Sequence, residues 1–270
     1  MSDVILSNRQ SGRVKRAAAL VRKKDRRAQG RFLVEGPQAV REALVHAPQL
    51  VEVVYATDEA QPWQLELDRL ADREGVELVR ATADVVAAMT ETVTPQGVVA
   101  VVADCRVPVA EACAGARLVA ILHEVRDPGN AGAVLRAADA AGADAVVFAG
   151  NSVDPLHPKV VRSTTGSLFH LPVASAPSLE DAVLAAREAG LAVVAADVGG
   201  VELAASREEQ GLAEPTAWVF GNEARGLSAD ALAHVDLSVR LPIFGRAESL
   251  NLATAASVLL YESAFAQRSR

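Results

Sequence analysis

The sequence has few cysteines, few aromatic residues and no long apolar run. Two cysteines in 270 residues cannot form a disulfide framework, which favours a reducing, cytoplasmic setting. Half of the residues are hydrophobic, yet no uninterrupted apolar stretch approaches the roughly 18 residues that a membrane span needs. The N-terminus has no apolar core of the kind found in secretory signals, so we expect no secretory signal there. Aromatic residues make up 4%, which predicts a core packed from small aliphatic side chains.

Positive charge is in deficit overall but concentrated near the N-terminus. The chain has 27 Lys and Arg against 34 Asp and Glu, a formal charge of −7. Residues 1–31 nevertheless hold ten basic and two acidic residues, a net +8, so the remainder carries 17 basic and 32 acidic residues, a net −15. A basic block on an acidic body favours a polyanionic partner, and we expect RNA contact there. The basic residues are Arg9, Arg13, Lys15, Arg16, Arg22, Lys23, Lys24, Arg26, Arg27 and Arg31.

The basic block also has a plainer explanation. The apolar residues between Val14 and Val21 give it one short apolar face and one basic face, as in an amphipathic helix. Such a helix could dock on the acidic surface of its own domain, with its cations solvated. Both interpretations predict a basic helix leading the chain.

The first hundred residues predict a small α/β domain. After the basic block, β-rich runs alternate with helical stretches. Strands are expected at 31–35, 51–55, 76–80 and 98–102, and helices at 38–46, 63–73 and 84–89. Residues 104–108 have the composition of a linker. We therefore place the first domain at residues 1–107 and the second at 108–270.

The second domain repeats the alternation of strands and helices. Strands are expected at 118–122, 145–148, 192–196, 217–220 and 237–240. Helices are expected at 131–141, 179–189, 230–233 and 249–266, with a helix or turn at 158–163. Strands separated by helices predict a mostly parallel sheet covered on both faces, so the fold class is α/β.

Ligands of such sheets bind beyond the carboxyl ends of the strands, and three segments there have unusual compositions. The segment 123–132 ends near Asn130, the expected N-cap of a helix whose early turns carry one charge, Arg136. The segment 219–228 places Gly221 at a strand tip, where a ligand could approach the backbone closely. The segment 241–254 has apolar residues suited to flank a flat ring, followed by Ser249 and Asn251.

Each segment alone has an ordinary explanation. The arginine could extend its charge from a core helix, the glycine could belong to a plain strand-to-helix loop, and the serine could merely cap a helix. The glycine-containing loop fits neither the dinucleotide nor the phosphate-loop pattern. The three segments together are more specific than any one of them.

Together they resemble the SpoU (TrmH-type) branch of the SPOUT methyltransferases, which transfer methyl from S-adenosylmethionine to a ribose 2′-hydroxyl of RNA. The first family motif, Asn-x-Gly followed by an apolar helix with an arginine, matches Asn130, Gly132 and Arg136. The second, an apolar strand followed by Gly-Asn-Glu and Gly-Leu, matches Gly221, Asn222, Glu223, Gly226 and Leu227. The third, Leu-Pro-apolar followed by Ser-Leu-Asn, matches Leu241, Pro242, Ile243, Ser249, Leu250 and Asn251. The stretch 158–169 is similar to the family's Lys-x-x-Arg-x-Ser-x-Gly segment, and 31–36 resembles the start of its small substrate-binding domain.

The resemblance implies a deep trefoil knot in the second domain, RNA substrate binding by the first, and a homodimer with the last helix at the interface. It implies cofactor contacts for Phe220, Gly221, Asn222, Gly226, Leu241, Pro242, Ile243, Ser249, Leu250 and Asn251. It implies catalytic or ribose-positioning roles for Arg136, Asn130, Glu223, Ser249 and Asn251, and phosphate contacts for Lys159 and Arg162.

The resemblance also implies a role for Arg136 in deprotonating the 2′-hydroxyl. A guanidinium is a poor base, with a pKa above about 12. We therefore expect Arg136 first to stabilise the developing alkoxide and to orient phosphate or ribose, with proton abstraction as the alternative.

No metal is expected, because a sulfonium is already a good leaving group and no histidines or cysteines stand at ligand spacing. The scattered candidates are His46, His123, His157, His170, His234, Cys105 and Cys113.

Three functions compete. The first is an RNA 2′-O-methyltransferase in the cytoplasm, acting on ribosomal RNA before transfer RNA as our first expectation. The second is a catalytically silent RNA-binding or ribosome-assembly factor on the same fold, against which the intact catalytic candidates argue. The third is an α/β enzyme of small-molecule chemistry, against which the basic block argues.

Overall fold

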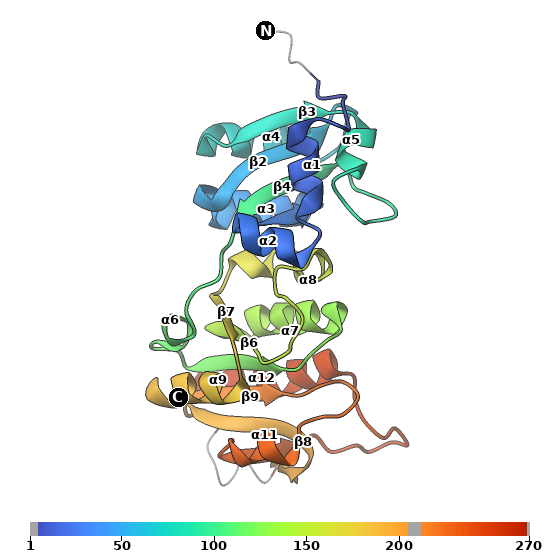
Figure 1. The fold of residues 1–270 in the computed structure, drawn as a ribbon. Coiled ribbons are helices and arrows are strands. Elements are labelled where there is room, and N and C mark those ends of the chain that lie inside the picture. Colours follow the sequence, from blue (N-terminus) through green and yellow to red (C-terminus); the bar gives the residue numbers. More distant parts are fainter. Residues whose placement is uncertain (1–4, 205–211, 269–270) are drawn as a thin grey trace. The chain divides into compact units, whose positions relative to one another are not determined.

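The structure, a computed structural model, describes residues 5–204 and 212–268. Asp3, counted in the charge of the basic block, lies outside the described residues. Contacts within the chain divide it into two compact units. The first comprises Met1–Cys105 and Leu156–His170, and the second comprises Arg106–Pro155 and Leu171–Arg270. The segment 156–170 therefore leaves the second unit and packs within the first, which nothing in the sequence indicated. Each unit has its own sheet (Figure 1).

The first unit is built on a mixed sheet of four strands in the order β1-β4-β2-β3. The strands are β1 (Arg31–Glu35), β2 (Val51–Thr57), β3 (Glu77–Ala81) and β4 (Val98–Ala103). β2 and β3 are parallel, whereas β4 inserts between β1 and β2 and runs antiparallel to both. The sequence predicted a small α/β domain here without strand directions, because alternation of elements along the chain does not fix the direction of a strand that returns to the middle of the sheet.

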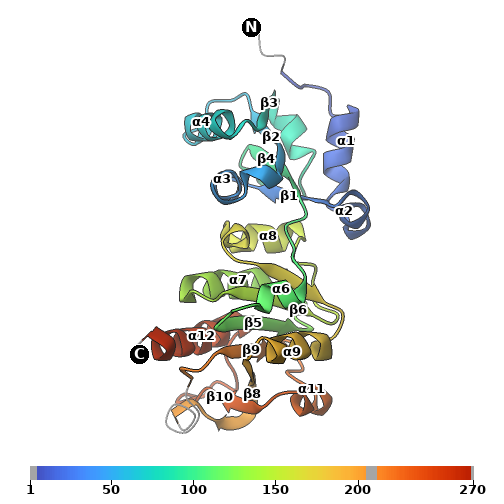
Figure 2. The ribbon, with the colours of Figure 1, turned by 90° about the vertical axis from the view of Figure 1, so that its left-hand side faces the viewer.

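Helices cover both faces of this sheet (Figure 2). They are α1 (Gly12–Ala19), α2 (Lys23–Gln29), α3 (Pro37–His46), α4 (Gln64–Glu74) and α5 (Ala83–Ala87), with the 3-10 turn η1 (Pro48–Leu50). α1 and α5 bury apolar side chains against one face, and α3 and α4 pack together on the other. The segment 156–170, which we call the excursion, adds α8 (Pro158–Thr164), which packs against β1 and α3. It also adds the 3-10 turn η2 (Ser167–Phe169).

The basic block forms two short helices, α1 and α2, rather than the single helix expected. Between them the chain turns, and Arg26 donates hydrogen bonds to the carbonyls of Leu20 and Val21 at 3.0 and 2.7 Å. The guanidinium satisfies carbonyls that a continuous helix would have paired with its own N–H groups. Arg26 is only 3% exposed, so the expectation that it lies on an exposed basic surface is wrong.

The other cations of the block divide into two groups. Arg13, Arg22 and Arg31 form exposed ion pairs, with Glu77, Asp25 and Glu52 respectively. Six others are exposed and form no ion pair with a described residue; these are Arg9, Lys15, Arg16, Lys23, Lys24 and Arg27. Docking on the chain's own acidic residues therefore accounts for part of the block, and six cations remain available to a partner.

The second unit has an all-parallel sheet of six strands in the order β10-β8-β9-β5-β6-β7, which confirms the expected parallel architecture. The strands are β5 (Leu118–His123), β6 (Ala145–Ala149), β7 (Val173–Ala176), β8 (Ala192–Glu202), β9 (Thr216–Phe220) and β10 (Leu237–Arg240). β7 was not foreseen. β8 is six residues longer than expected, because its pairing with β10 shifts register between Ser238 and Val239 and then continues.

Helices pack on both faces of the parallel sheet. They are α6 (Val109–Cys113), α7 (Pro128–Ala141), α9 (Leu179–Glu188), α11 (Ala229–Ala233) and α12 (Leu252–Arg268). α6, α9 and α11 contribute to one buried cluster of small aliphatic residues, whereas α7 and α12 pack extensively on each other. None of the described helices is long and apolar enough to cross a bilayer.

The two tryptophans of the chain lie in different units. Trp218, on β9, is fully buried, its ring stacks on Phe220 at 6.4 Å between centroids, and its indole N–H donates to the hydroxyl of Ser263 on α12 at 2.9 Å. Trp63 precedes α4 in the first unit and is partly exposed. Because an indole N–H buried without a partner is costly, the bond to Ser263 fixes α12 on the sheet.

Candidate active site

The three unusual segments lie at the carboxyl ends of β5, β9 and β10, as the sequence predicted. Their polar side chains meet in one chain of hydrogen bonds. The Asn251 amide donates to the Asn130 side-chain oxygen at 2.9 Å, and the Asn130 amide donates to Glu223 Oε1 at 3.4 Å. Residues 93 and 121 positions apart in the sequence are thereby brought together.

Glu223 binds the loop after β5 to the loop after β9. Its carboxylate accepts from the Asp127 N–H at 3.0 Å and from the Arg126 N–H at 3.3 Å, in addition to Asn130. These are the backbone groups that precede helix α7. A carboxylate facing the N-terminal end of a helix is favoured by the helix dipole. Glu223 therefore holds the loop after β5 in place.

Helix α7 begins three residues earlier than the sequence suggested. Its N-cap is Asp127, whose carboxylate accepts from the Asn130 N–H at 2.8 Å, and Pro128 occupies the first helical position. The expectation that Asn130 is the N-cap is therefore wrong. An Asp-Pro pair at a helix start is the usual signal, since proline tolerates the lack of an N–H there. Asn130 lies inside the first turn, and its side chain is free to face Glu223 and Asn251.

A second link joins the same two loops, through Asn222 and through two residues to which the sequence argument gave no role, Glu124 and Arg225. Asn222 donates to the Glu124 carbonyl at 2.9 Å, and Arg225 forms an ion pair with the Glu124 carboxylate at 2.9 Å. Glu124 has a φ of 54°, in the left-handed region that a non-glycine residue rarely adopts. Only the charge of Glu124 beside a strand end could have drawn attention to it in the sequence.

The close packing of the loop after β9 leaves no room for a side chain at Gly221. A Cβ on Gly221 would lie 2.7 Å from the Gly226 carbonyl carbon and 2.8 Å from Leu227 Cγ. Asn222 and Gly226 exchange two backbone hydrogen bonds across this turn, at 3.2 and 2.8 Å. The loop's own backbone thus requires glycine here; the approach of a ligand to Gly221 stays a prediction.

Arg136 lies on the third turn of α7 with its side chain exposed. It has no hydrogen-bond or ion-pair partner among the described residues. The positions on either side of Arg136 in α7 are apolar and largely buried. Among the described residues of this part of the helix, Arg136 carries the one charge. A cation in this state keeps its full hydrogen-bonding capacity for an anion or a developing oxyanion.

The loop after β10 differs from the other two. Residues 241–250 make no backbone–backbone hydrogen bond to a described residue, and all but Leu241 and Pro242 are exposed. Ile243 is 38% and Leu250 42% exposed. Asn251 ends the loop by accepting from the Ala253 and Thr254 N–H groups, so α12 begins at Leu252 and Ser249 belongs to the loop rather than to the helix as expected.

These features fit an adenosine-bearing cofactor. Free main-chain N–H and C=O groups can recognise a base edge, and exposed aliphatic side chains can cover its faces. Phe220 is an exception among the predicted contacts: its ring is fully buried against Trp218, so only its main chain faces the loop.

His123 ends β5 beside these loops. Burial lowers the pKa of its imidazole, partly opposed by the neighbouring Glu124 carboxylate. Its Nδ1 is buried and has no hydrogen-bond partner among the described residues. The ring is therefore neutral at pH 7.

Lys159 and Arg162 lie on α8, which packs within the first unit. Arg162 donates to Thr92 Oγ1 and lies 3.3 Å from the carboxylate of the buried Glu35. Lys159 is exposed. The cation of Arg162 is thus held by a buried carboxylate, whereas that of Lys159 is not.

Comparison with known proteins agrees with this geometry. A model of the SpoU rRNA Methylase family matches residues 117–261, and a model of the MRM3-like substrate binding domain matches residues 11–100. The 23S rRNA (guanosine(2553)-2′-O)-methyltransferase RlmP of Bacillus subtilis is 38% identical over 242 residues, which cover 88% of this chain and 90% of that protein. A 23S rRNA (uridine(2479)-2′-O)-methyltransferase of Streptomyces viridochromogenes is 35% identical, covering 91% of this chain and 86% of the relative.

Solved structures agree as well. The SpoU methyltransferase AviRb of Streptomyces viridochromogenes, in complex with AdoMet, superposes with a TM-score of 0.81 at 32% identity, covering 96% of this chain and all of that one. An AdoMet-bound rRNA methyltransferase of Sinorhizobium meliloti superposes with a TM-score of 0.80 at 29% identity, covering 96% and 97% of the two chains. With its motifs, fold and relatives in agreement over nearly the whole chain, the protein belongs to the SpoU rRNA methylase family.

Proposed function

We propose that the protein transfers methyl from S-adenosylmethionine to a ribose 2′-hydroxyl of ribosomal RNA. The observation that carries the proposal is the hydrogen-bonded chain Asn251–Asn130–Glu223, which brings the three family motifs together at the carboxyl edge of the parallel sheet. The relatives named above are ribosomal RNA 2′-O-methyltransferases, and two superposed structures hold AdoMet. Transfer RNA remains the alternative substrate.

The cofactor would be held by the loop after β10. Its exposed backbone groups and the side chains of Ile243 and Leu250 supply the contacts for the adenine, together with the main chain of Leu241 and Pro242. Gly221, Asn222 and Gly226 form the tight turn that faces it. Bound there, S-adenosylmethionine supplies an electrophilic methyl group, and no protein nucleophile is needed.

Arg136 would act on the substrate. Its unpartnered guanidinium stabilises the 2′-oxygen as it loses its proton and orients the adjacent phosphate. Glu223, Asn130 and Asn251 position the ribose by fixing the loop that carries them, and Ser249 offers a hydroxyl at the edge of the cofactor loop. The resting carboxylate of Glu223 already accepts three hydrogen bonds, which favours positioning over proton transfer.

The direct test is single-turnover transfer of labelled methyl from S-adenosylmethionine to ribosomal RNA of the source cell, followed by mapping of the modified ribose. Transfer RNA and a 2′-deoxy substrate at the mapped position serve as controls. Methyl found on a base, or no transfer by folded protein that binds the cofactor, would contradict the proposal. The second outcome would revive the silent RNA-binding factor.

The N-terminal domain, which we place at residues 1–107, would supply RNA affinity together with the segment 156–170 that packs within the first unit. The six exposed, unpaired cations of the basic block and Lys159 carry this proposal. Deleting the block is a poor test, because Val14, Ala17 and Leu20 are buried in the core of the first unit. Lys23→Gln with Lys24→Gln should instead lower the salt slope of RNA binding by about 0.7–0.9 for each phosphate that is no longer neutralised. Arg22→Gln is the matched control, since Arg22 already pairs with Asp25.

We further propose a homodimer in the cytoplasm, with α12 at its interface. Val258, Tyr261 and Phe265 expose 40%, 38% and 64% of their surfaces along this helix. Positions 258, 261 and 265 share one helical face, and such an apolar stripe favours a partner. Sedimentation of wild type and Phe265→Glu tests this: the variant should be monomeric. A chain with two cysteines in 270 residues suits a reducing compartment. The trefoil knot stays a prediction of the family resemblance.

A further inference from the structure

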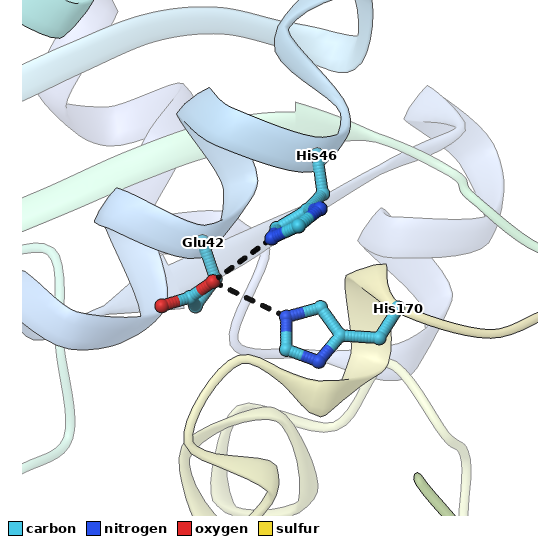
Figure 3. A group of neighbouring side chains, drawn as sticks. All are labelled: Glu42, His46 and His170. Carbon is cyan, nitrogen blue, oxygen red and sulfur yellow. Dashed lines mark hydrogen bonds and ion pairs between the residues drawn. The ribbon is translucent and has the colours of Figure 1, made fainter. Parts of the chain in front are cut away.

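A cluster of ligand-type side chains lies in the first unit, apart from the candidate active site. Glu42 and His46 on α3 and His170 after η2 each present one nitrogen or oxygen, and these three atoms lie within 4.8 Å of one another. The Nε2 atoms of both histidines approach the same carboxylate oxygen, Glu42 Oε2, at 3.2 Å each (Figure 3). The two imidazole rings are 4.6 Å apart between centroids.

The sequence hid this cluster. Glu42 and His46 stand four residues apart, which places them on one face of a helix, but a single such pair is common on exposed helices. His170 is 128 residues from Glu42 and reaches it only because the segment 156–170 packs within the first unit. The scattering of histidines along the chain therefore gave no sign of a ligand set.

Other contacts fix the orientation of the Glu42 carboxylate. Glu42 is 7% exposed, and its Oε1 accepts from the Gln38 amide at 2.7 Å and from the Arg41 guanidinium at 2.9 Å. Oε2 is left to face the two imidazoles. Groups that hold a ligating carboxylate in this way recur around metal sites and raise their affinity. The positive charge of Arg41 is shared with Glu66, to which it also donates at 2.7 Å.

The backbone at Gly166, just before η2, approaches the Glu42 side chain closely. Gly166 has a φ of +108°, and a Cβ there would collide with Glu42 Cγ and lie 2.7 Å from Glu42 Cβ. Only glycine permits this contact. The stacking of Phe169 on Phe32, 6.4 Å between centroids, further fixes the turn that carries His170.

We propose that Glu42, His46 and His170 form a binding site for a divalent transition-metal ion, with zinc as the preferred occupant. Two imidazole nitrogens and one carboxylate oxygen are a known zinc ligand set that leaves a fourth position for water. Bonds of about 2.0–2.1 Å in a tetrahedral site separate the ligand atoms by roughly 3.3 Å, close to the two separations of 3.2 Å found here. The ion would link α3 to the turn after η2, because its ligands come from both. No fourth ligand-type side chain among the described residues completes the site.

The test uses the untagged, full-length protein. It is stripped with a chelator, and zinc alone is then added in competition with a chromophoric chelator. We expect one zinc per chain, visible absorption bands of a tetrahedral site when cobalt replaces zinc, and a zinc-dependent rise in melting temperature. His46→Ala and His170→Ala should each weaken zinc binding by about 100-fold or more, since even the loss of an outer-shell partner costs 10–100-fold.

Two further variants separate metal binding from folding. Glu42→Gln keeps the size of the side chain and one oxygen but removes the anionic ligand, and it should also weaken zinc binding. His234→Ala removes a histidine of the second unit that lies outside the cluster, and it should bind zinc as the wild type does. Wild type that binds no zinc, or cluster variants that bind it as tightly as wild type, would overturn the proposal and leave two imidazoles hydrogen-bonded to a carboxylate.

Discussion

The loops after β5 and β9 are held very differently from the loop after β10. The first two are bridged by hydrogen bonds and an ion pair from Glu223, Asn222 and Arg225. The third has no backbone hydrogen bond to a described residue over 241–250, and the side chain of Asn251 ties it to Asn130. Under the proposed function, the two tied loops would form a preformed substrate side, and the open loop would offer its main-chain groups to the cofactor.

The largest expected effect comes from removing the unpartnered charge of Arg136. Arg136→Ala should lower single-turnover methyl transfer by about two to three decades, or about 3–4 kcal/mol, because the guanidinium meets charge that develops in the transition state. Cofactor affinity, measured by calorimetry, should stay near wild type. Arg136→Lys should recover little, since an ammonium cannot reproduce a planar fork. Near-normal transfer by the alanine variant would remove Arg136 from the chemistry.

Glu223→Ala tests whether the tied loops depend on their carboxylate. The change leaves two N–H groups and one amide without their acceptor, and we expect a loss of about 1–2 kcal/mol of unfolding free energy, moderated by solvent exposure. Ser249→Ala, on the open loop, is the matched control and should leave stability unchanged. Denaturant titration measures both. Equal stability of the two variants would mean that the loops are not held differently after all.

Leu250→Ala tests the open loop from the cofactor side. Removing a half-exposed leucine that a bound adenine would cover should weaken cofactor affinity by about 1 kcal/mol, roughly fivefold. Stability in the absence of cofactor should hardly change, because the side chain is 42% exposed in the free protein. An unchanged dissociation constant for S-adenosylhomocysteine would place the adenine elsewhere.

Asp127→Ala removes the N-cap of α7. Such caps are worth about 1 kcal/mol, so the free energy of unfolding should fall by about that amount. Asp127→Asn keeps a capping oxygen and should retain most of the stability. If both variants unfold like wild type, the helix start is held by Glu223 alone.

The smallest effect concerns His123, whose pKa is lowered by burial. A histidine that is harder to protonate in the fold than in the unfolded chain favours the unfolded state when protons bind. Its contribution is complete above the unfolded pKa of about 6.5 and is lost as the pH falls through that value toward the folded pKa. His123→Phe should flatten this part of the stability–pH curve. An equally steep curve in the variant would assign the pH dependence to other groups.

Sequence reasoning predicted that the three segments would meet, because the ends of strands can be recognised in a sequence. β5, β9 and β10 each end where a run of apolar residues stops, and parallel pairing brings their carboxyl ends to one edge. The assignment of individual roles was harder. Asn130 and Asp127 are both good capping residues, and only the backbone conformation tells which one precedes the helix. Gly221 has a structural reason that the sequence did not show, since a Cβ there would collide with the backbone of Gly226.

Other features depend on packing between distant segments and left no local trace. The excursion 156–170 into the first unit, the antiparallel insertion of β4 and the burial of Arg26 are of this kind. The same holds for the meeting of Glu42 with His170. A sequence pattern reports the environment along an element, whereas these features depend on which elements become neighbours.

The placement of one tryptophan in each unit makes the chain its own optical reporter. Trp218, buried and hydrogen-bonded to Ser263, should emit at short wavelength while α12 stays on the sheet, and its emission should shift to the red when that helix detaches. Trp63, partly exposed beside α4, reports on the other unit. Replacing either indole by phenylalanine would leave a single tryptophan, so that the melting of the six-stranded sheet and of the four-stranded sheet could be followed one at a time, without labels.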